Sequence, residues 1–380
     1  VEISRDQHRV TLEHRGLSPS AQVIDCGNSG STLRMLAGVL AAQPFRSTLT
    51  GDASLRRRPV ARIVEPLRRM GATLGAADGD RLPPLTIEGS ALRGIDYRLP
   101  VASAQVASAI QFAATFATGP TTVEIPGPAR DHTERMLAAS GARVTVEALP
   151  GGGRRVRVEP GSPSGLRRFA VPADPSGAAF FLAAAAASPG SEVTACGLSL
   201  NPTRTGFLEV LQEMGAHVSI VPRGEASGDP IGDVTVGAPA RLRAFDVPAE
   251  WLPRLVDEVP AWAILAAVAE GTSRVRGAAE LRVKESDRLA AVVEALRATG
   301  IEAVETPDGL AVTGGRPHGA RVAAHGDHRI AMAFAAFGVL AGGAIEVDDA
   351  GAIATSFPGF AGVLESLGGR VDHGGGGTST

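Results

Sequence analysis

The stretch "LQEMGAHV", residues 211–218, has the pattern of a helix that ends at a glycine and is followed by a strand. Five copies of this pattern, Leu-x-x-x-Gly and then a strand, occur along the chain: "LRRMGATL" (67–74), "LAASGARV" (137–144), "LQEMGAHV" (211–218), "LRATGIEA" (296–303) and "LESLGGRV" (364–371). Glycine suits the position after a helix because it accepts a positive φ without steric cost. Such glycines mark helix ends in any α/β protein, but the steps of 70, 74, 85 and 68 residues between these five favour a repeat.

The repeat predicts compact units of roughly 70 residues, each with about two helices and four strands, which is longer than the common solenoid repeats. One further step before Gly71 ends close to residue 1. The opening "VEISRDQHRVTLEH" (1–14) carries Val1, Ile3, Val10 and Leu12 at strand positions. We therefore expect a six-unit architecture that the chain enters partway, with the first helix and strands of one unit upstream of Val1.

The length of 380 residues exceeds what one hydrophobic core usually organises, so we expect two domains. We place them at residues 1–170 and 171–372, with the boundary near "RRFAVPADPSGAAF" (167–180). The Gly-rich end, residues 373–380, is expected to be disordered.

Charge and composition exclude several classes of protein. A net charge of −3 offers no electrostatic footprint for nucleic acid or an anionic membrane. Cys26 and Cys196 have no metal-ligand spacing, which argues for a reducing compartment and against structural zinc. The longest apolar run, "GAAFFLAAAAA" (177–187), is too short to cross a bilayer. We expect a cytoplasmic protein.

Lys284 is the only lysine among 37 basic residues. It lies in "ELRVKESDRLAAVVEALRATG" (280–300), where Leu289 and Val293 belong to the apolar face of a helix capped by Ser286 or a neighbour. If the first turn begins at Lys284, then Lys284 and Arg288 share a face and both oppose the helix dipole. A bound anion would reverse that penalty. The alternatives are that neighbouring acidic residues neutralise the pair, and that one lysine survived by chance.

Other helix starts have the same character. "DHRIAMAFAAFGVL" (327–340) has Asp327 as its cap and Arg329 in its first turn, and "GNSGSTLRML" (27–36) offers bare backbone N–H groups. "SAQVASAIQFAATFATG" (103–119) begins with Ser103 and Gln105, and "LRRRPV" (55–60) ends near Pro59, a suitable first residue of a helix. Together these helix starts predict one ligand with several negative charges.

Two carboxylates are candidates for proton transfer. Asp257 and Glu258 precede Pro260 and an apolar helix, where acidic residues commonly do no more than complement the dipole. Glu285 stands between Lys284 and Arg288, so it is the stronger candidate for an acid or base beside an anionic substrate.

In their order and joint occurrence these motifs resemble the EPSP synthase (3-phosphoshikimate 1-carboxyvinyltransferase) family. The resemblance covers residue 25 to about 370 and is carried by "DCGNSGSTLRML", "GDASLRRRPV", "LPVASAQVASA", "RDHTERML", "NPTRTGFLEVLQEMGA", "VDEVP", "LRVKESDRL", "DHRIAMAFA" and "ATSFPGF". It implies transfer of the enolpyruvyl group of phosphoenolpyruvate to the 5-hydroxyl of shikimate-3-phosphate, with release of phosphate. It implies an α/β (α+β) fold, a two-domain inside-out barrel of βαββαβ units whose helix N-termini face the cleft between the domains. It implies a monomer with no metal or organic cofactor.

The resemblance also implies roles for individual residues. Phosphoenolpyruvate would be bound by a first set: Gly30, Arg58, Gln105, Arg288 and Arg329. Shikimate-3-phosphate would be bound by a second set: Ser103, Ala104, Gln105, Asp257 and Lys284. Asp257 would take the proton of the attacking hydroxyl, Lys284 would bind beside it, and Glu285 would deliver a proton to the methylene carbon.

Three departures from the family pattern concern substrate binding. The N-terminal segment K-S-x-S-x-R has no match in this chain. Ala129 stands where a Ser or Thr usually precedes "RDHTE", and Ala107 stands where a lysine often follows "SAQV". Two alternatives remain: an inactive fragment or binding module of the same fold, and the related transferase acting on UDP-N-acetylglucosamine. The latter relies on a reactive loop cysteine, which neither Cys26 nor Cys196 resembles.

Overall fold

The computed structural model describes residues 2–6, 9–13, 16–161, 163, 165 and 168–372. The chain divides into two compact units, Val1–Phe169 and Ala170–Thr380. This division is one residue from the domain boundary that we placed after residue 170. The expected disordered tail, 373–380, lies outside the described residues.

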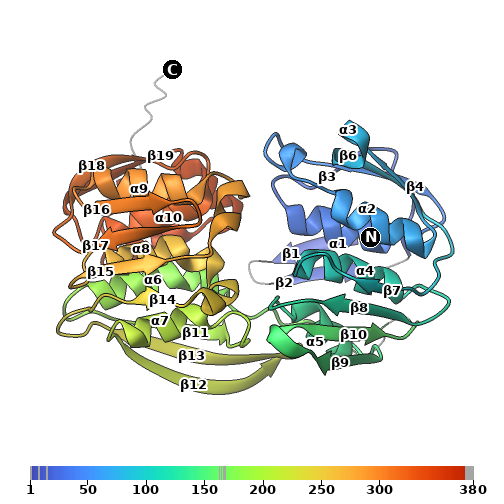
Figure 1. Ribbon diagram of the computed structural model, residues 1–380, viewed down its shortest axis with the longest axis horizontal. Coiled ribbons are helices and arrows are strands. Elements are labelled where there is room, and N and C mark those ends of the chain that lie inside the picture. Colours follow the sequence, from blue (N-terminus) through green and yellow to red (C-terminus); the bar gives the residue numbers. More distant parts are fainter. Residues whose placement is uncertain are drawn as a thin grey trace. The chain divides into compact units, whose positions relative to one another are not determined.

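The helices and strands of unit 1 alternate along the chain (Figure 1). Its strands are β1 (Glu2–Asp6), β2 (Arg9–Glu13), β3 (Ile24–Asp25), β4 (Arg46–Thr50), β5 (Thr73–Ala76), β6 (Leu82–Glu88), β7 (Asp96–Arg98), β8 (Thr121–Ile125), β9 (Val144–Ala148) and β10 (Arg154–Val158). Its helices are α1 (Gly30–Leu40), α2 (Ala61–Met70), α3 (Ala77–Asp80), α4 (Ala104–Ala114) and α5 (His132–Ala139), with 3-10 turns η1 (Leu55–Arg57) and η2 (Pro150–Gly152).

The core of unit 1 is a layer of helices covered by sheets. One sheet has the order β3-β4-β6-β5 and another the order β7-β8-β10-β9. Helices α1 and α2 both pack on α4, and all three helices pack on these sheets. Gly38 brings α1 very close to α4, because a Cβ there would overlap the carbonyl oxygen of Ala109.

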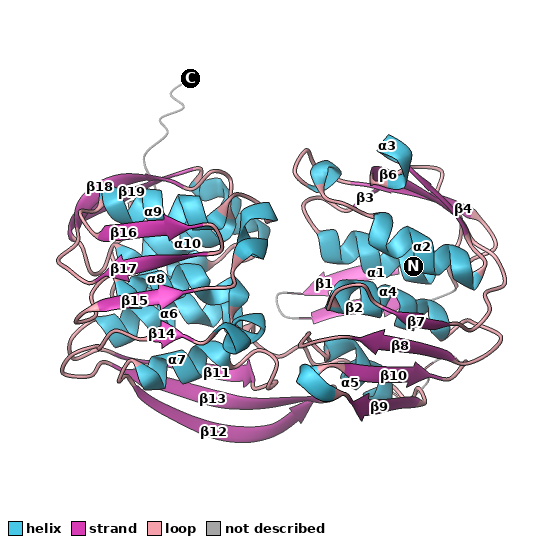
Figure 2. Ribbon diagram, in the orientation of Figure 1, coloured by secondary structure: helices cyan, strands magenta, loops and turns pink. Residues whose placement is uncertain are grey.

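Unit 2 continues the same alternation, with its strands and helices coloured separately in Figure 2. Its strands are β11 (Glu192–Ser199), β12 (His217–Ala226), β13 (Asp229–Gly237), β14 (Asp246–Val247), β15 (Thr272–Val275), β16 (Glu302–Thr306), β17 (Gly309–Thr313), β18 (His318–Ala323) and β19 (Gly342–Asp348). Its helices are α6 (Pro175–Ala187), α7 (Gly206–Glu213), α8 (Val259–Ala266), α9 (Arg288–Ala298), α10 (His328–Phe337) and α11 (Phe360–Ser366). Its 3-10 turns are η3 (Ala249–Arg254), η4 (Val256–Glu258), η5 (Ala279–Val283) and η6 (Ala350–Thr355).

Three central helices, α6, α8 and α10, form the core of unit 2. They pack on one another, and the sheets of this unit lie outside them. Every residue of α8 is buried, which is what a helix that is apolar on all sides requires. The run 177–187 is the main part of α6, and its residues 179–186 are buried for the same reason. Among the described residues, no helix has the length and apolarity that crossing a membrane demands.

The five repeated glycines end helices as predicted. Gly71, Gly141, Gly215, Gly300 and Gly368 have φ values of 117°, 86°, 97°, 81° and 96°. A strand follows the first four of them: β5, β9, β12 and β16. The fifth prediction was wrong in part, because no strand is present between Gly368 and Asp372 in the described part of the chain.

Within one repeat of roughly 70 residues, the order of elements differs from the expected βαββαβ. From β3 to β6 the order is β-α-β-α-β-β, apart from the short α3, and the same order recurs from β7 to β10 and from β14 to β17. The two antiparallel strands that are adjacent in sequence thus come last in each repeat, after its second helix. The strands expected at residues 1–14 are β1 and β2, which pair with each other, while Val1 lies outside the described residues.

Pro59 does not begin a helix, contrary to the prediction. Helix α2 begins at Ala61 with Val60 as its N-cap, so Pro59 stands just ahead of it. The backbone N–H of Val60 donates to the carbonyl of Arg81 at 2.8 Å, outside the helix.

Candidate active site

Arg288 is the buried centre of a polar cluster in unit 2. It is the first residue of α9, and its side chain is 2% exposed. Its Nε lies 2.8 Å from Asp327 Oδ2, its Nη2 lies 2.6 Å from Glu285 Oε2 and its Nη1 lies 3.4 Å from Asp257 Oδ1. Burial by itself lowers the pKa of Arg288, but the nearby Asp327 and Glu285 outweigh it and raise that pKa above its usual value. Arg288 therefore keeps its positive charge inside the cluster.

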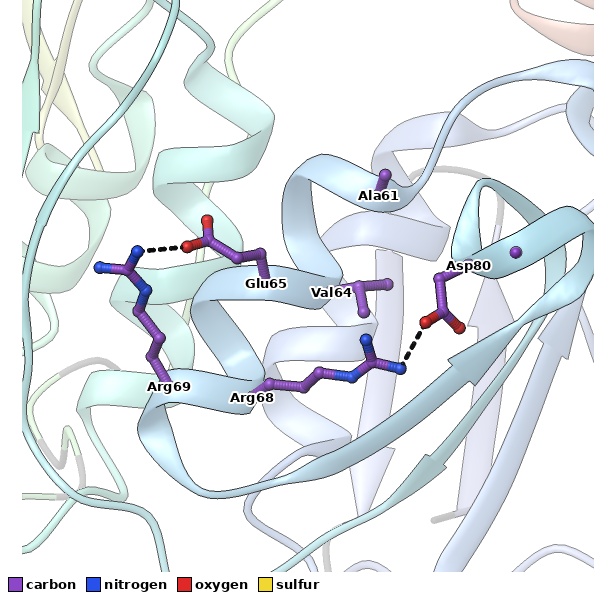
Figure 3. A pocket seen from close by; sticks show the side chains of 7 residues that line it. Ala61, Val64, Glu65, Arg68, Arg69 and Asp80 are labelled. Atoms are coloured by element: carbon purple, nitrogen blue, oxygen red, sulfur yellow. Dashed lines mark hydrogen bonds and ion pairs between the residues drawn. The ribbon is translucent and has the colours of Figure 1, made fainter.

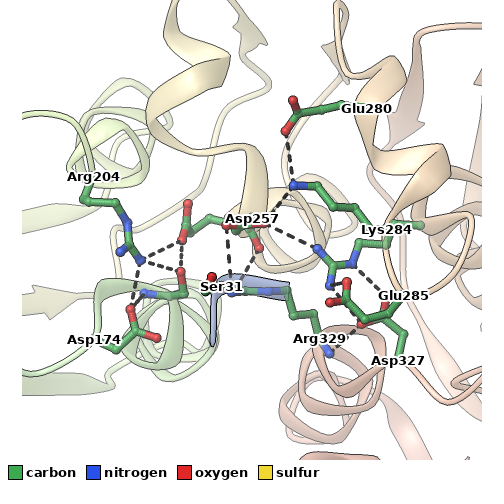
Figure 4. Close-up of polar contacts among 12 residues, drawn as sticks. Ser31, Asp174, Arg204, Asp257, Glu280, Lys284, Glu285, Asp327 and Arg329 are labelled. Carbon is green, nitrogen blue, oxygen red and sulfur yellow. Dashed lines mark hydrogen bonds and ion pairs between the residues drawn. The ribbon is translucent and has the colours of Figure 1, made fainter. Parts of the chain in front are cut away.

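Asp257 faces three cations within unit 2 (Figure 4). It lies in η4, directly before α8. Its carboxylate oxygens lie 3.8 Å from Lys284 Nζ, 3.4 Å from Arg288 Nη1 and 3.9 Å from Arg329 Nη2. Arg329 also donates to the backbone carbonyl of Asp257, over 3.2 Å. A carboxylate in this setting can accept a proton from a substrate group held by the same cations.

Lys284 lies outside the helix in which we expected it. The side chain of Asp287 accepts the backbone N–H of Ala290 and caps α9, so the helix begins at Arg288 and Lys284 follows η5. Lys284 and Arg288 therefore do not share a helix face. The ammonium of Lys284 lies 3.3 Å from Glu280 Oε1, and its side chain is 30% exposed.

Asp327 joins the starts of α9 and α10. As the N-cap of α10 it accepts the backbone N–H of Arg329 at 2.9 Å, as predicted, and it also accepts the hydroxyl of Ser286 at 3.1 Å. It is fully buried. Burial alone would raise the pKa of Asp327, but the charge and hydrogen bonds of Arg288 hold that pKa below its usual value. Its neighbour His328 has a lowered pKa because burial and the adjacent Arg329 both disfavour the imidazolium.

A second cluster lies in unit 1 at the starts of α1 and α4. Gln105 Nε2 donates to Ser31 Oγ at 2.8 Å, and Gln105 Oε1 accepts from Arg34 Nη1 at 2.8 Å. Burial lowers the pKa of Arg34, and the nearby Arg58 lowers it further. A Cβ on Gly30 would lie 2.5 Å from Arg34 Nη1, so this glycine gives the guanidinium its space.

Arg58, Ser103 and Ala104 complete the predicted set in unit 1. Arg58 Nη2 donates to Asn28 Oδ1 at 3.0 Å and to Ser54 Oγ at 3.3 Å, which holds it near the GNSG turn. Ser103 is the N-cap of α4 and Ala104 is its first residue. Unit 1 therefore brings Gly30, Arg58 and Gln105 to one cluster.

The two alanines that depart from the family pattern occupy different surroundings in unit 1. Ala107 is buried in α4. The carbonyl of Ala129 accepts a hydrogen bond from Arg154 Nη1 at 2.7 Å, so the backbone before "RDHTE" is held by a side chain of β10.

The pocket in Figure 3 is not the predicted site. It has a volume of about 460 Å³ and lies against α2, where it is lined by Ala61, Val64, Glu65, Arg68, Arg69, Gly79 and Asp80. Arg68 pairs with Asp80 at 2.7 Å and Arg69 with Glu65 at 2.6 Å, so its cations are already neutralised. In the part of the chain that the structure describes, no group of His, Cys, Asp and Glu could hold a metal ion.

Residues 1–364 match the model of the family described as EPSP synthase (3-phosphoshikimate 1-carboxyvinyltransferase). The chain belongs to the EPSP synthase family. A 3-phosphoshikimate 1-carboxyvinyltransferase of an Anaeromyxobacter species is 52% identical over 360 residues, which are 94% of this chain and 82% of that protein. The enzyme of the same name from Geobacter sulfurreducens is 46% identical over 371 residues, 97% of this chain and 85% of that protein.

Solved structures agree with this assignment. The EPSP synthase of Acinetobacter baumannii superposes with a TM-score of 0.82 at 41% identity, over 93% of this chain and 80% of that one. The enolpyruvyl transferase NikO from Streptomyces tendae has a TM-score of 0.67 at 15% identity, over 92% of this chain and 95% of that one, which is a likeness of fold alone. The predicted family and the α/β class of the fold are confirmed.

The site prediction did not include Arg34 and Asp327, which both belong to these clusters. Arg34 lies one helical turn after Gly30, on the same face of α1, and that spacing was the available signal. Asp327 was predicted as a helix cap only. Asp327 and Arg288 are 39 positions apart in the chain, so no local sequence pattern could predict their contact.

Proposed function

We propose that this protein transfers the enolpyruvyl group of phosphoenolpyruvate to the 5-hydroxyl of shikimate-3-phosphate and releases phosphate. The observation that carries the proposal is the setting of Asp257, a carboxylate with Lys284, Arg288 and Arg329 around it, in a chain of the EPSP synthase family. Both substrates are anions that such cations bind. A carboxylate at the same place supplies the base that the attacking hydroxyl needs.

The proposed reaction is an addition followed by an elimination. Asp257 accepts the proton of the 5-hydroxyl while the oxygen of that hydroxyl forms a bond to C2 of phosphoenolpyruvate. At the same time C3 of phosphoenolpyruvate takes a proton with help from Glu285. The product of this step is a tetrahedral intermediate. Loss of one C3 proton and cleavage of the C2–O bond to phosphate then regenerate the double bond and release inorganic phosphate.

The predicted site residues are divided between the two substrates in this scheme. Arg288 and Arg329, with Arg58 and the backbone of Gly30 in unit 1, bind phosphoenolpyruvate. Lys284 binds shikimate-3-phosphate beside Asp257. Ser103, Ala104 and Gln105 bind shikimate-3-phosphate, and Gln105 also reaches phosphoenolpyruvate. The buried carboxylate of Asp327 keeps Arg288 in one orientation, which supports its part in the scheme.

The proposal includes a cytoplasmic monomer that binds neither nucleic acid nor membranes. A net charge of −3 supports the last part, the lack of binding to nucleic acid and membranes, because it provides no general attraction for polyanions. The rival reaction on UDP-N-acetylglucosamine is less well supported. Cys26 is buried, and burial raises the pKa of its thiol, which opposes the thiolate that such a cysteine must provide.

Phosphate release in the presence of both substrates tests the function. We expect release that requires both substrates, and a loss of about 10²- to 10⁴-fold in kcat for Asp257→Asn, because a general base is removed. Asp348→Asn, a change at a surface ion pair with Arg321, is the matched control and should retain full activity. The assay is run on this chain and on one with a K-S-x-S-x-R segment added upstream; no release from either would contradict the proposed function.

A further inference from the structure

Arg204 lies in the loop 200–205 between β11 and α7, within the stretch "NPTRTG" (201–206), and the proposed function gives it no task. Hydrogen bonds of the Asn201 side chain hold this loop in place. Asn201 Oδ1 accepts the backbone N–H of Thr203 at 2.8 Å, and Asn201 Nδ2 donates to Asp229 Oδ1 at 2.8 Å. The side chain of Arg204 is 11% exposed, so it is directed into unit 2 from a fixed base.

The guanidinium of Arg204 bridges two elements that are far apart in sequence. Its Nη2 lies 2.9 Å from Asp174 Oδ1 and 2.8 Å from Ser176 Oγ, both at the start of α6, and 3.9 Å from Glu258 Oε1 in η4 (Figure 4). Ser176 Oγ also donates to Glu258 Oε1. Ser176 and Glu258 are 2% and 1% exposed, so this junction is a buried one. Buried polar groups of this kind hold their elements in one arrangement only while every member keeps its partners.

The junction ends one residue from Asp257. Successive residues of a 3-10 turn point in directions about 120° apart, so Glu258 and Asp257 leave η4 on different sides. Lys284, Arg288 and Arg329 form ion pairs with Asp257. Arg204 forms an ion pair with Glu258, and Ser176 donates a hydrogen bond to it. The backbone of η4 is thus held between two sets of polar contacts. Loss of either set lets it shift toward the other.

We propose that Arg204 is a positioning residue for the reaction. By joining Ser176 and Glu258 it sets where the carboxylate of Asp257 stands relative to the hydroxyl that it deprotonates. The inference rests on the proposed function, in which Asp257 is the base. Arg204 itself binds neither substrate, so its effect falls on turnover and not on affinity.

The test compares kcat and KM for both substrates in Arg204→Gln, Arg204→Lys and Ser176→Ala with the unchanged protein. We expect Arg204→Gln to lower kcat by about 10- to 100-fold, because a displacement near 1 Å of a catalytic group has an effect of that order. Both KM values should stay within about threefold, since the interaction lost is one that acts in the transition state. Arg204→Lys restores part of kcat by keeping the charge. Ser176→Ala should also lower kcat. Because it changes the side-chain volume less than Arg204→Gln does, it still tests the proposal if Arg204→Gln folds poorly.

Arg297→Gln is the matched control. Arg297 is an exposed arginine in the last turn of α9, and like Arg204 it makes a defined contact within unit 2, because its Nε donates to the carbonyl of Ala303 in β16 at 2.8 Å. It should keep kcat even where its unfolding midpoint falls as far as that of Arg204→Gln. A kcat for Arg204→Gln and Ser176→Ala within about twofold of the unchanged protein, or an equal loss in the control, overturns the positioning role. The comparison uses whichever form turns over, this chain or the one with the upstream K-S-x-S-x-R segment, and absence of turnover in both contradicts the proposed function itself, and this inference with it.

Discussion

At the scale of single residues, the burial of Arg288 governs the site in unit 2. An unpaired charge in a protein interior costs several kcal/mol, and the carboxylates of Asp327, Glu285 and Asp257 offset this cost. The same three contacts leave Arg288 little freedom to move. Lys284 differs, because it is 30% exposed and lies 3.3 Å and 3.8 Å from its carboxylate neighbours. The site therefore combines a rigid arginine with a lysine that can adapt to a ligand.

Lys284→Arg should lower kcat by about 100-fold or more while the fold is retained. A guanidinium is larger than an ammonium and does not exchange protons near neutral pH, so it cannot reproduce the contact beside Asp257. Phosphate release measures the activity, and circular dichroism checks the fold. Turnover close to that of the unchanged protein would mean that the lone lysine is an accident of composition.

Gly30→Ala should weaken compact inhibitors that compete with phosphoenolpyruvate. The new Cβ would lie 2.5 Å from Arg34 Nη1, so Arg34 must move and its hydrogen bond to Gln105 is strained. We expect the inhibition constant to rise more than the KM for phosphoenolpyruvate, as a small rigid inhibitor has less freedom to adapt. Gly351→Ala, at a position with open space around the added carbon, serves as control. Equal inhibition of Gly30→Ala and the unchanged protein would contradict the prediction.

At the scale of elements, helix starts and helix ends were the most predictable features of this fold. The glycine at a helix end answers a steric demand of one or two residues, so the five repeated glycines were found without reference to the rest of the molecule. The start of α10 followed the same logic, with Asp327 as its cap. The cap of α9 was predicted as Ser286 or a neighbour and is Asp287, whereas a first turn beginning at Lys284 was wrong, because the helix begins at Arg288.

Asp327→Asn should destabilise unit 2 by about 3 kcal/mol at neutral pH, since it removes the charge that pairs with the buried Arg288. Asparagine can still cap α10, so the loss reports the ion pair. The pKa of Asp327 lies below its usual value, so its stabilising effect is complete above about pH 4 and is lost as pH falls through the folded-state pKa. The difference between the two proteins should therefore shrink below pH 4.

Urea unfolding followed by tryptophan emission is the measurement for this change. Both tryptophans, Trp251 and Trp262, lie in unit 2, so the emission reports that unit alone. Asp348→Asn removes an exposed carboxylate from its pair with Arg321 and should leave the midpoint almost unchanged. A pH-independent difference for Asp327→Asn would contradict the role of its charge.

At the scale of the whole molecule, each unit has its own hydrophobic core. The core of unit 1 is built on α1, α2 and α4, and that of unit 2 on α6, α8 and α10, with no buried side chain shared between the two clusters among the described residues. Independent cores are the usual condition for independent folding.

A chain of residues 170–372 should therefore fold by itself. Trp262 is completely buried within the core of unit 2, so its emission should stay at the short wavelength of an apolar environment. Unfolding in urea should be cooperative, with a midpoint close to that reported by tryptophan in the full chain. Long-wavelength emission without a cooperative transition would show that unit 2 needs unit 1 to fold.

The sequence by itself determined the family, the α/β class, the positions of the repeated helix ends and most of the helix starts. All of these depend on backbone sterics and capping within a few residues, or on motifs that are continuous in the chain. The tertiary structure decided which charges meet: Arg288 with Asp327 across 39 positions and Arg34 with Gln105 across 71. It also decided the burial of Arg288 and the junction of Arg204 with Ser176 and Glu258. Such pairs follow from how helices pack, and helix packing depends on the whole core.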